Sequence, residues 1–154
     1  MQQILVLGAG KIGSLIACLL AQSNAYRVCL ADLELLEAEK VRDKINLTGI
    51  TAAQVDANQA SSLEALIKQQ QFTAVISCLP YFCNPTVATV ASRTGLHYFD
   101  LTEDIRVTEH TRALSDTTAT ALVPQCGLAP GFIGIVAHHL MSQFESVDSV
   151  KMRV

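Results

Sequence analysis

The chain has 154 residues, which is the length of one ordinary domain. Hydrophobic residues make up 50% and charged residues 16%, a composition that excludes intrinsic disorder of the low-hydropathy, high-charge kind. Eleven basic against fourteen acidic residues give a net charge of -3 with no basic cluster, so nucleic-acid binding is not expected. For a mass of 16.6 kDa, folding is expected to leave about 7,600 Å² of surface accessible.

The five cysteines are odd in number and contain no C-x-x-C pair, which indicates reduced thiols and a cytoplasmic protein. Residues 1–7 have no basic n-region and the apolar run stops at Gly8, so no secretory signal is expected. The longest segment without acidic or basic residues, 117–144, is interrupted by Pro124 and Pro130. No membrane span is therefore predicted.

Short apolar runs alternate with segments of helical periodicity, which is typical of βαβ units around a parallel sheet. In the first half of the chain we predict strands at 4–7, 26–31 and 50–55. Helices are predicted between them and after the third strand, at 12–20, 33–45 and 61–67. Ser61 and Glu64 are expected to form a capping box at the start of the third helix.

The second half continues the pattern, with strands predicted at 73–79, 97–99 and 120–123. Asn84 as N-cap with Pro85 after it predicts a helix that ends at Gly95, and 102–114 is expected to be an irregular or helical crossover. A last helix is predicted from Pro130 and Gly131. Four apolar residues recur on one of its faces: Phe132, Val136, Leu140 and Phe144.

Together these elements predict an α/β fold, a doubly wound parallel sheet in three α/β/α layers. Residues 1–146 are assigned to this domain. Residues 147–154 alternate apolar and polar side chains as a half-buried strand does, and we interpret them as the first strand leading to a missing substrate or dimerisation domain. The chain is therefore expected to be a fragment or an isolated domain.

A glycine motif, G-x-G-x-x-G, lies directly after the first strand and before the first helix. Gly8 permits the tight turn, Gly10 lets the backbone approach a pyrophosphate, and Gly13 allows close packing of helix on strand. The helix N-terminus then presents the N–H groups of Lys11, Ile12 and Gly13 to the phosphates. In this context the motif predicts a dinucleotide-binding Rossmann domain; the Lys11 side chain is predicted either to approach the pyrophosphate or to stay in solvent.

Asp32 follows the second strand, 19 residues after Gly13, where a carboxylate can accept from the ribose 2'-hydroxyl. A 2'-phosphate would be repelled by this carboxylate, and no Arg or Lys occurs from Leu33 to Glu39 to receive it. NAD is therefore predicted in preference to NADP. The alternative is that the glycines are only turn residues and that Asp32 only caps the next helix.

Ligands of open parallel sheets lie beyond the carboxyl ends of the strands, so residues there are further candidates. For the cofactor these are Asp56 and Ala57, placed to reach adenine, and Cys78, Leu79 and Pro80. Asp100 and Cys126 follow the last two strands. For Asp56 and Asp100 a capping role, for Pro80 a plain turn and for Cys126 burial as a small residue are the alternatives.

The histidines form no metal-binding set, because His138 and His139 are adjacent and have no partner at ligand spacing. No metal is predicted. His97 is expected to be a packed core histidine or, as the less favoured alternative, a neighbour of the site. Nucleophile-elbow and P-loop patterns are absent from the sequence, which leaves hydrolase and kinase interpretations without support.

The chain resembles the N-terminal nucleotide-binding part of the saccharopine dehydrogenase family, which includes lysine 6-dehydrogenases. The residues that carry the resemblance are Ile4–Gly13 with Asp32, Val75–Tyr81, His97–Thr102, Cys126–Gly131 and 147–154. The resemblance implies NAD(P)-dependent oxidation of the CH–NH group of an amino acid, with hydride transfer to the cofactor and hydrolysis of the imine.

The same resemblance places Asp100 and Cys126 at the cleft between the nucleotide and substrate domains, as substrate-side or proton-transfer residues. Members of the family continue well past residue 154 into a domain that supplies substrate contacts and often dimer contacts, so the resemblance implies a homodimer formed through that domain. This chain alone is expected to bind the cofactor but hardly to catalyse. The alternative is a self-contained Rossmann module that binds the nucleotide for regulation and performs no chemistry.

Overall fold

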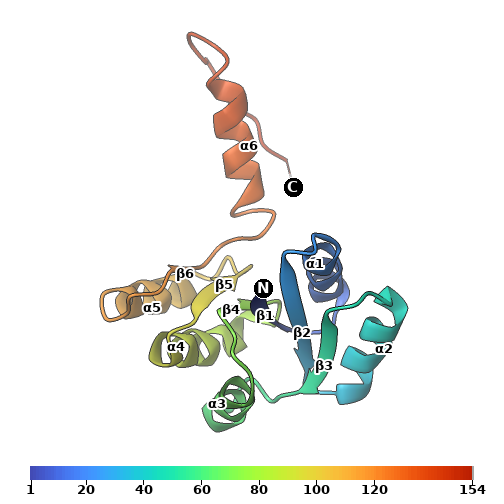
Figure 1. Ribbon diagram of the computed structural model, residues 1–154. Coiled ribbons are helices and arrows are strands. Elements are labelled where there is room, and N and C mark those ends of the chain that lie inside the picture. The colour runs from blue at the N-terminus through green and yellow to red at the C-terminus, as the bar shows by residue number, and fades with distance from the viewer. Residues whose placement is uncertain (154) are drawn as a thin grey trace.

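The computed structural model describes residues 1–153 and contains one sheet of six parallel strands in the order β3-β2-β1-β4-β5-β6 (Figure 1). The strands are β1 (Gln2–Leu7), β2 (Tyr26–Asp32), β3 (Ile50–Gln54), β4 (Ala74–Ser77), β5 (His97–Asp100) and β6 (Leu122–Val123). The predicted doubly wound parallel sheet is thereby confirmed. The order reverses between β1 and β4, and in such sheets the crevice at this switch point takes the ligand.

Helices cover both faces of the sheet, as the alternating pattern predicts (Figure 1). One face carries α1 (Lys11–Gln22) and α2 (Leu35–Ile45), and the other carries α3 (Ala60–Gln69), α4 (Asn84–Thr94) and α5 (Ile105–Ser115). Successive strand residues point to opposite faces, so Val6 packs with the first pair of helices while Leu5 and Leu7 pack with α3 and α4.

Two predicted helix starts are wrong in detail. Helix α3 begins at Ala60 with Gln59 as its N-cap, so Ser61 lies inside the first turn and forms no capping box with Glu64. Asn84 is the first residue of α4 rather than its N-cap, because its Oδ1 accepts a hydrogen bond from the buried Ser77 hydroxyl at 2.7 Å. The helix does end at Gly95, which has a left-handed backbone with φ +72°.

The crossover after β5 is helical, since α5 begins at the N-cap Asp104, whose carboxylate accepts from the Val107 N–H at 3.0 Å. A 3-10 turn, η1 (Tyr81–Cys83), follows β4. No helix among residues 1–153 is both long and apolar enough to cross a membrane.

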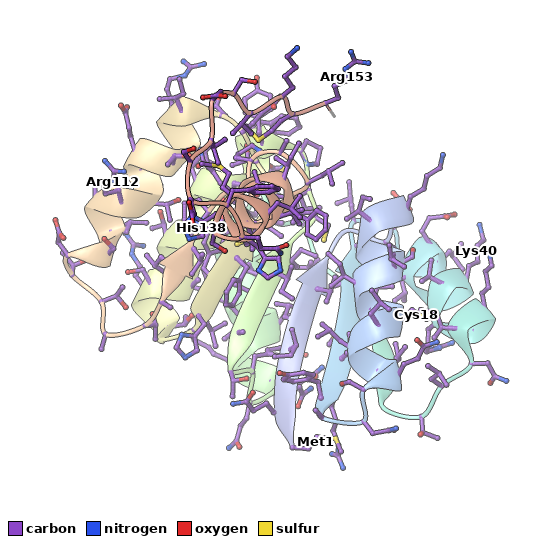
Figure 2. All side chains as sticks on the ribbon, turned by 90° about the horizontal axis from the view of Figure 1, so that it is seen from above. Met1, Cys18, Lys40, Arg112, His138 and Arg153 are labelled. Carbon is purple, nitrogen blue, oxygen red and sulfur yellow. The ribbon has the colours of Figure 1, made fainter. Side chains whose placement is uncertain are left out.

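The last helix, α6 (Phe132–Met141), stands away from the sheet and is seen nearly end-on in Figure 2, with His138 on it and Met1 at the edge where the strands begin. None of its residues is buried. The strand predicted at 147–154 is wrong over the described residues 147–153, which are exposed and irregular. Without a neighbouring strand to pair with, an alternating segment has no partner for its backbone hydrogen bonds; Val154 lies outside the described residues.

Candidate cofactor-binding site

The glycine motif forms the turn between β1 and α1, as predicted. Gly8 has φ +97°, a backbone conformation that favours glycine, and its N–H donates to the Ala31 carbonyl at 2.8 Å. A Cβ added to Gly13 would lie 1.8 Å from the Gly8 carbonyl oxygen, whereas one added to Gly10 would meet no atom within 4 Å. The protein itself therefore requires glycine at position 13, while the space beside Gly10 is open for a ligand.

The N-terminus of α1 is suited to an anion. Its N-cap is Gly10, which offers no side chain to cap the helix, and the first turn contains no acidic residue. The N–H groups of Lys11, Ile12 and Gly13 belong to this first turn, where helical N–H groups have no partner within the helix. Together with the positive end of the helix dipole they fit a pyrophosphate. The Lys11 side chain is exposed.

Asp32 joins the second strand to the glycine turn. Its Oδ2 accepts from the Ala9 N–H at 2.7 Å, and its Oδ1 accepts from the Glu34 N–H at 3.1 Å. The N-cap of α2 is Glu34, so Asp32 is not the cap of that helix. Its half-buried carboxylate is held at the carboxyl end of β2, beside the loop that would contact the phosphates.

A cleft of about 210 Å³ opens beside these residues, at the carboxyl ends of β1, β2, β3 and β4. Five predicted cofactor residues line it: Asp32, Asp56, Ala57, Leu79 and Pro80. Sequence reasoning did not single out Asn58, Phe82 or Cys83, which line it too. The rule that selects residues just past each strand would have found Phe82 if extended by two residues beyond Pro80.

Asp56 and Cys78 have additional structural roles. Both Asp56 carboxylate oxygens accept hydrogen bonds within their own turn, Oδ1 from the Asn58 N–H and Oδ2 from the Gln59 side chain, each at 3.0 Å. Cys78 lies under the glycine turn, with its N–H donating to the Leu7 carbonyl at 2.9 Å. Burial raises the pKa of the Cys78 thiol to about 11, so this thiol keeps its proton at neutral pH.

Asp100 is completely buried and hydrogen-bonded on both oxygens. Oδ2 accepts from the Tyr98 hydroxyl at 2.6 Å, and Oδ1 accepts from the N–H groups of Thr102 at 2.9 Å and Gln125 at 3.1 Å. Burial, followed by this bond to Asp100, raises the pKa of Tyr98. The carboxylate thus ties the end of β5 to the loop that carries Cys126, whose N–H donates to the Asp100 carbonyl at 2.7 Å.

Cys126 is exposed, so its interpretation as a buried small residue is wrong. Partial burial of the thiol, and then the negative charge of Asp100, raise its pKa. His97 is also exposed, at the start of β5, and its Nδ1 accepts from the Ala121 N–H at 3.0 Å. It therefore lies neither in the core nor at the carboxyl ends of the strands. Among residues 1–153 no three His, Cys, Asp or Glu side chains gather as metal ligands would.

A parallel sheet in this strand order, with a glycine turn leading into a helix N-terminus, defines an NAD(P)-binding Rossmann domain. The family model of the saccharopine dehydrogenase NADP-binding domain matches residues 4–124. The chain therefore belongs to this family, as the resemblance in its sequence predicts.

Solved structures share the fold. Saccharopine dehydrogenase (L-Glu forming) from Saccharomyces cerevisiae is similar with a TM-score of 0.79 and 21% identity, covering 93% of this chain and 31% of that one. A myo-inositol dehydrogenase from Corynebacterium glutamicum has a TM-score of 0.66 and 16% identity over 93% of this chain and 41% of its own. A scyllo-inositol dehydrogenase from Lactobacillus casei has a TM-score of 0.64 and 17% identity, over 80% of this chain and 36% of its own. The chain spans less than half of each of these proteins.

Proposed function

We propose that this chain is the NAD-binding domain of an oxidoreductase that acts on the CH–NH group of an amino acid. The observation that carries the cofactor proposal is the Asp32 carboxylate, which lines the cleft and accepts from the Ala9 N–H of the open glycine turn. The CH–NH chemistry is supported by the family to which the chain belongs. In the proposed complex, the N–H groups of Lys11, Ile12 and Gly13 bind the pyrophosphate and Asp32 accepts from the ribose hydroxyls. When bound, the nicotinamide ring accepts the hydride.

A preference for NAD over NADP is part of the proposal, although the family description names NADP. The Asp32 carboxylate is fixed by two backbone N–H groups, so it cannot easily turn away from a 2'-phosphate. No arginine or lysine occurs from Leu33 to Glu39 to compensate the phosphate charge. Like-charge repulsion at this position therefore disfavours NADP.

On the substrate side, we propose Cys126 as the proton-transfer residue and Asp100 as the residue that positions its loop. Cys126 is exposed, and its raised pKa keeps the thiol protonated at neutral pH. It would therefore donate a proton to the leaving amine nitrogen during hydrolysis of the imine, and it would not be the group that accepts the proton lost on oxidation. Asp100 is buried and already accepts three hydrogen bonds, so it acts through the loop rather than on a substrate.

The cofactor proposal is tested by calorimetric titration of the chain with NADH and with NADPH. We expect NADH to bind at least about tenfold more tightly, a difference of about 1.4 kcal/mol. Asp32→Asn keeps an oxygen to accept from the Ala9 N–H but removes the charge, so it is expected to reduce the preference to within about threefold. Asp32→Ala serves as the comparison that removes the acceptor as well.

A wild-type chain that binds neither nucleotide at millimolar concentration would contradict the proposal, and equal affinity for both would contradict the NAD preference alone. The alternative of a regulatory module without catalysis predicts the same binding. The two proposals separate in an assay of amine-dependent NAD reduction by a protein that carries this domain together with a substrate domain. Reduction that Cys126→Ala impairs while NADH binding stays intact supports the enzyme, and no reduction supports the module.

A further inference from the structure

We propose that the cleft recognises the adenine base of its cofactor by stacking on Phe82, without a hydrogen bond from the base to Asp56. This inference rests on the proposed binding of a nicotinamide dinucleotide. It adds the residue that holds the base and the way in which the base is selected.

The orientation of the ligand follows from the residues already placed. The phosphates belong at the N-terminus of α1 and the ribose at Asp32, so the base extends into the cleft beyond Asp32. There the lining is mainly apolar, with Val55, Ala57, Leu79, Pro80, Phe82 and Cys83. A flat, uncharged aromatic base fits such a lining.

Phe82 is the one aromatic ring among the residues that line this cleft. It lies in η1 directly after β4, and 61% of its surface is exposed, although most phenylalanines of folded domains bury more. Tyr81 meets it edge to face, with ring centroids 5.8 Å apart and planes at 78°, an arrangement that favours one ring orientation. The exposed ring surface is available to stack on a base.

Asp56 is a polar residue at this end of the cleft, and its carboxylate can accept from the adenine amino group. Its two oxygens, however, already accept from Asn58 and Gln59, and its N–H donates to the Ser62 hydroxyl at 3.2 Å. These bonds shape the turn that forms one wall of the cleft. Both oxygens are engaged in shaping this wall, and a bond from the amino group would be a second bond to an oxygen that already has one. We therefore assign the selection of the base to shape and stacking.

The first test compares NADH with its hypoxanthine analogue, reduced nicotinamide hypoxanthine dinucleotide, by calorimetry on the same chain. The analogue replaces the amino group of the base by a carbonyl and keeps the flat ring system. We expect the two affinities to agree within about twofold. A loss of tenfold or more would overturn the inference, because it would show that a hydrogen-bond acceptor such as Asp56 reads the amino group.

The second test is Phe82→Ala, which is expected to weaken NADH binding at least about fivefold, the lower end of what a base stacked on an aromatic ring contributes. Phe82→Leu is expected to weaken it as well, whereas Phe82→Trp restores an affinity within about twofold of wild type. The matched control is Phe144→Ala, which removes an equally exposed phenylalanine, at 68%, that lies outside the cleft.

Urea unfolding of each variant separates binding from folding, since a merely structural role of Phe82 would lower stability and would not be rescued by tryptophan. Unchanged NADH binding by Phe82→Ala overturns the stacking inference and leaves the proposed function standing. Failure of the wild-type chain to bind NADH overturns the proposed function itself, so the two failures are distinguishable.

Discussion

At the scale of single residues, Asp100 shows how a buried carboxylate is kept without a cation. It accepts from one hydroxyl and two backbone N–H groups, and no buried polar side-chain atom among the described residues lacks a hydrogen-bond partner. The charge of the carboxylate is felt at Cys126, where it adds to burial in raising the thiol pKa. A residue with a structural role thus also contributes, after burial, to the raised pKa of its exposed neighbour.

Alkylation of Cys126 is predicted to be slow at pH 7.5 and to rise with pH beyond the range of an ordinary thiol, because only the thiolate reacts and a raised pKa lowers its fraction. Asp100→Asn removes the charge and is expected to lower the pKa and speed the reaction. An asparagine can still accept from Thr102 and Gln125 through its oxygen while its amide donates to the Tyr98 hydroxyl.

Iodoacetamide labelling followed by peptide mapping measures this rate, with the urea-unfolded chain as the reference for an unperturbed thiol. Native Cys126 that reacts as fast as in the unfolded chain at pH 7.5 would show that its pKa is not raised.

Most of the residues at the proposed cofactor site follow from spacing alone. Gly8, Gly10, Gly13 and Asp32 were predictable because a strand, a glycine turn and a helix in that order bring them together in any parallel sheet. The exposure of Cys126 could not be predicted in the same way, because the apolar residues around it in the sequence resemble a core segment. Burial depends on what packs over a segment, and one sequence does not contain that information.

At the scale of elements, the unit β1-turn-α1 depends on contact between two backbones. The Gly13 Cα faces the Gly8 carbonyl so closely that no side chain fits between them. This contact sets the angle at which α1 leaves the strand, and therefore the direction in which its first N–H groups point.

Gly13→Ala is predicted to destabilise the fold by about 1–3 kcal/mol or more, because its Cβ would lie 1.8 Å from a backbone oxygen and α1 would have to move. NADH binding should be lost with it. The matched control is Gly134→Ala inside α6, where an added Cβ meets no atom within 4 Å and a gain of up to about 1 kcal/mol in helix propensity is expected. Urea unfolding compares the two, and equal stability would refute the steric argument.

The order and type of the elements were predictable from periodicity, whereas the ends of helices were less so. Asn84 has the sequence signature of an N-cap, yet a buried hydroxyl on β4 engages its side chain and the helix begins one residue earlier than expected. Competition between a local cap and a contact from a distant strand is decided by tertiary packing. The sequence around Asn84 shows its capping signature, but it does not show that the Ser77 hydroxyl contacts its side chain.

At the scale of the whole molecule, the accessible surface is 9500 Å², well above the value of about 7,600 Å² expected for a compact chain of this mass. The excess reflects α6 and the residues after it, which extend away from the sheet (Figure 1). Of the four residues predicted to share one face of the last helix, Phe132, Val136 and Leu140 lie on α6, whereas Phe144 lies beyond its end at Met141. None of the four is buried: Val136 is half-buried and the other three are exposed.

Removal of residues 135–154 is predicted to change the free energy of unfolding by less than about 1 kcal/mol, because no residue of this segment described in the structure is buried. NADH affinity should be unchanged as well. Urea unfolding and calorimetry of the shortened chain test both expectations. A loss of several kcal/mol would mean that α6 packs on the domain in solution.

The position of α6 keeps its apolar side chains apart from the core that surrounds the sheet. Its apolar side chains are displayed on a helix that shares no buried residue with the sheet, so covering them requires no rearrangement of the nucleotide-binding core. We therefore expect substitutions on the exposed side chains of α6 to leave nucleotide affinity unchanged.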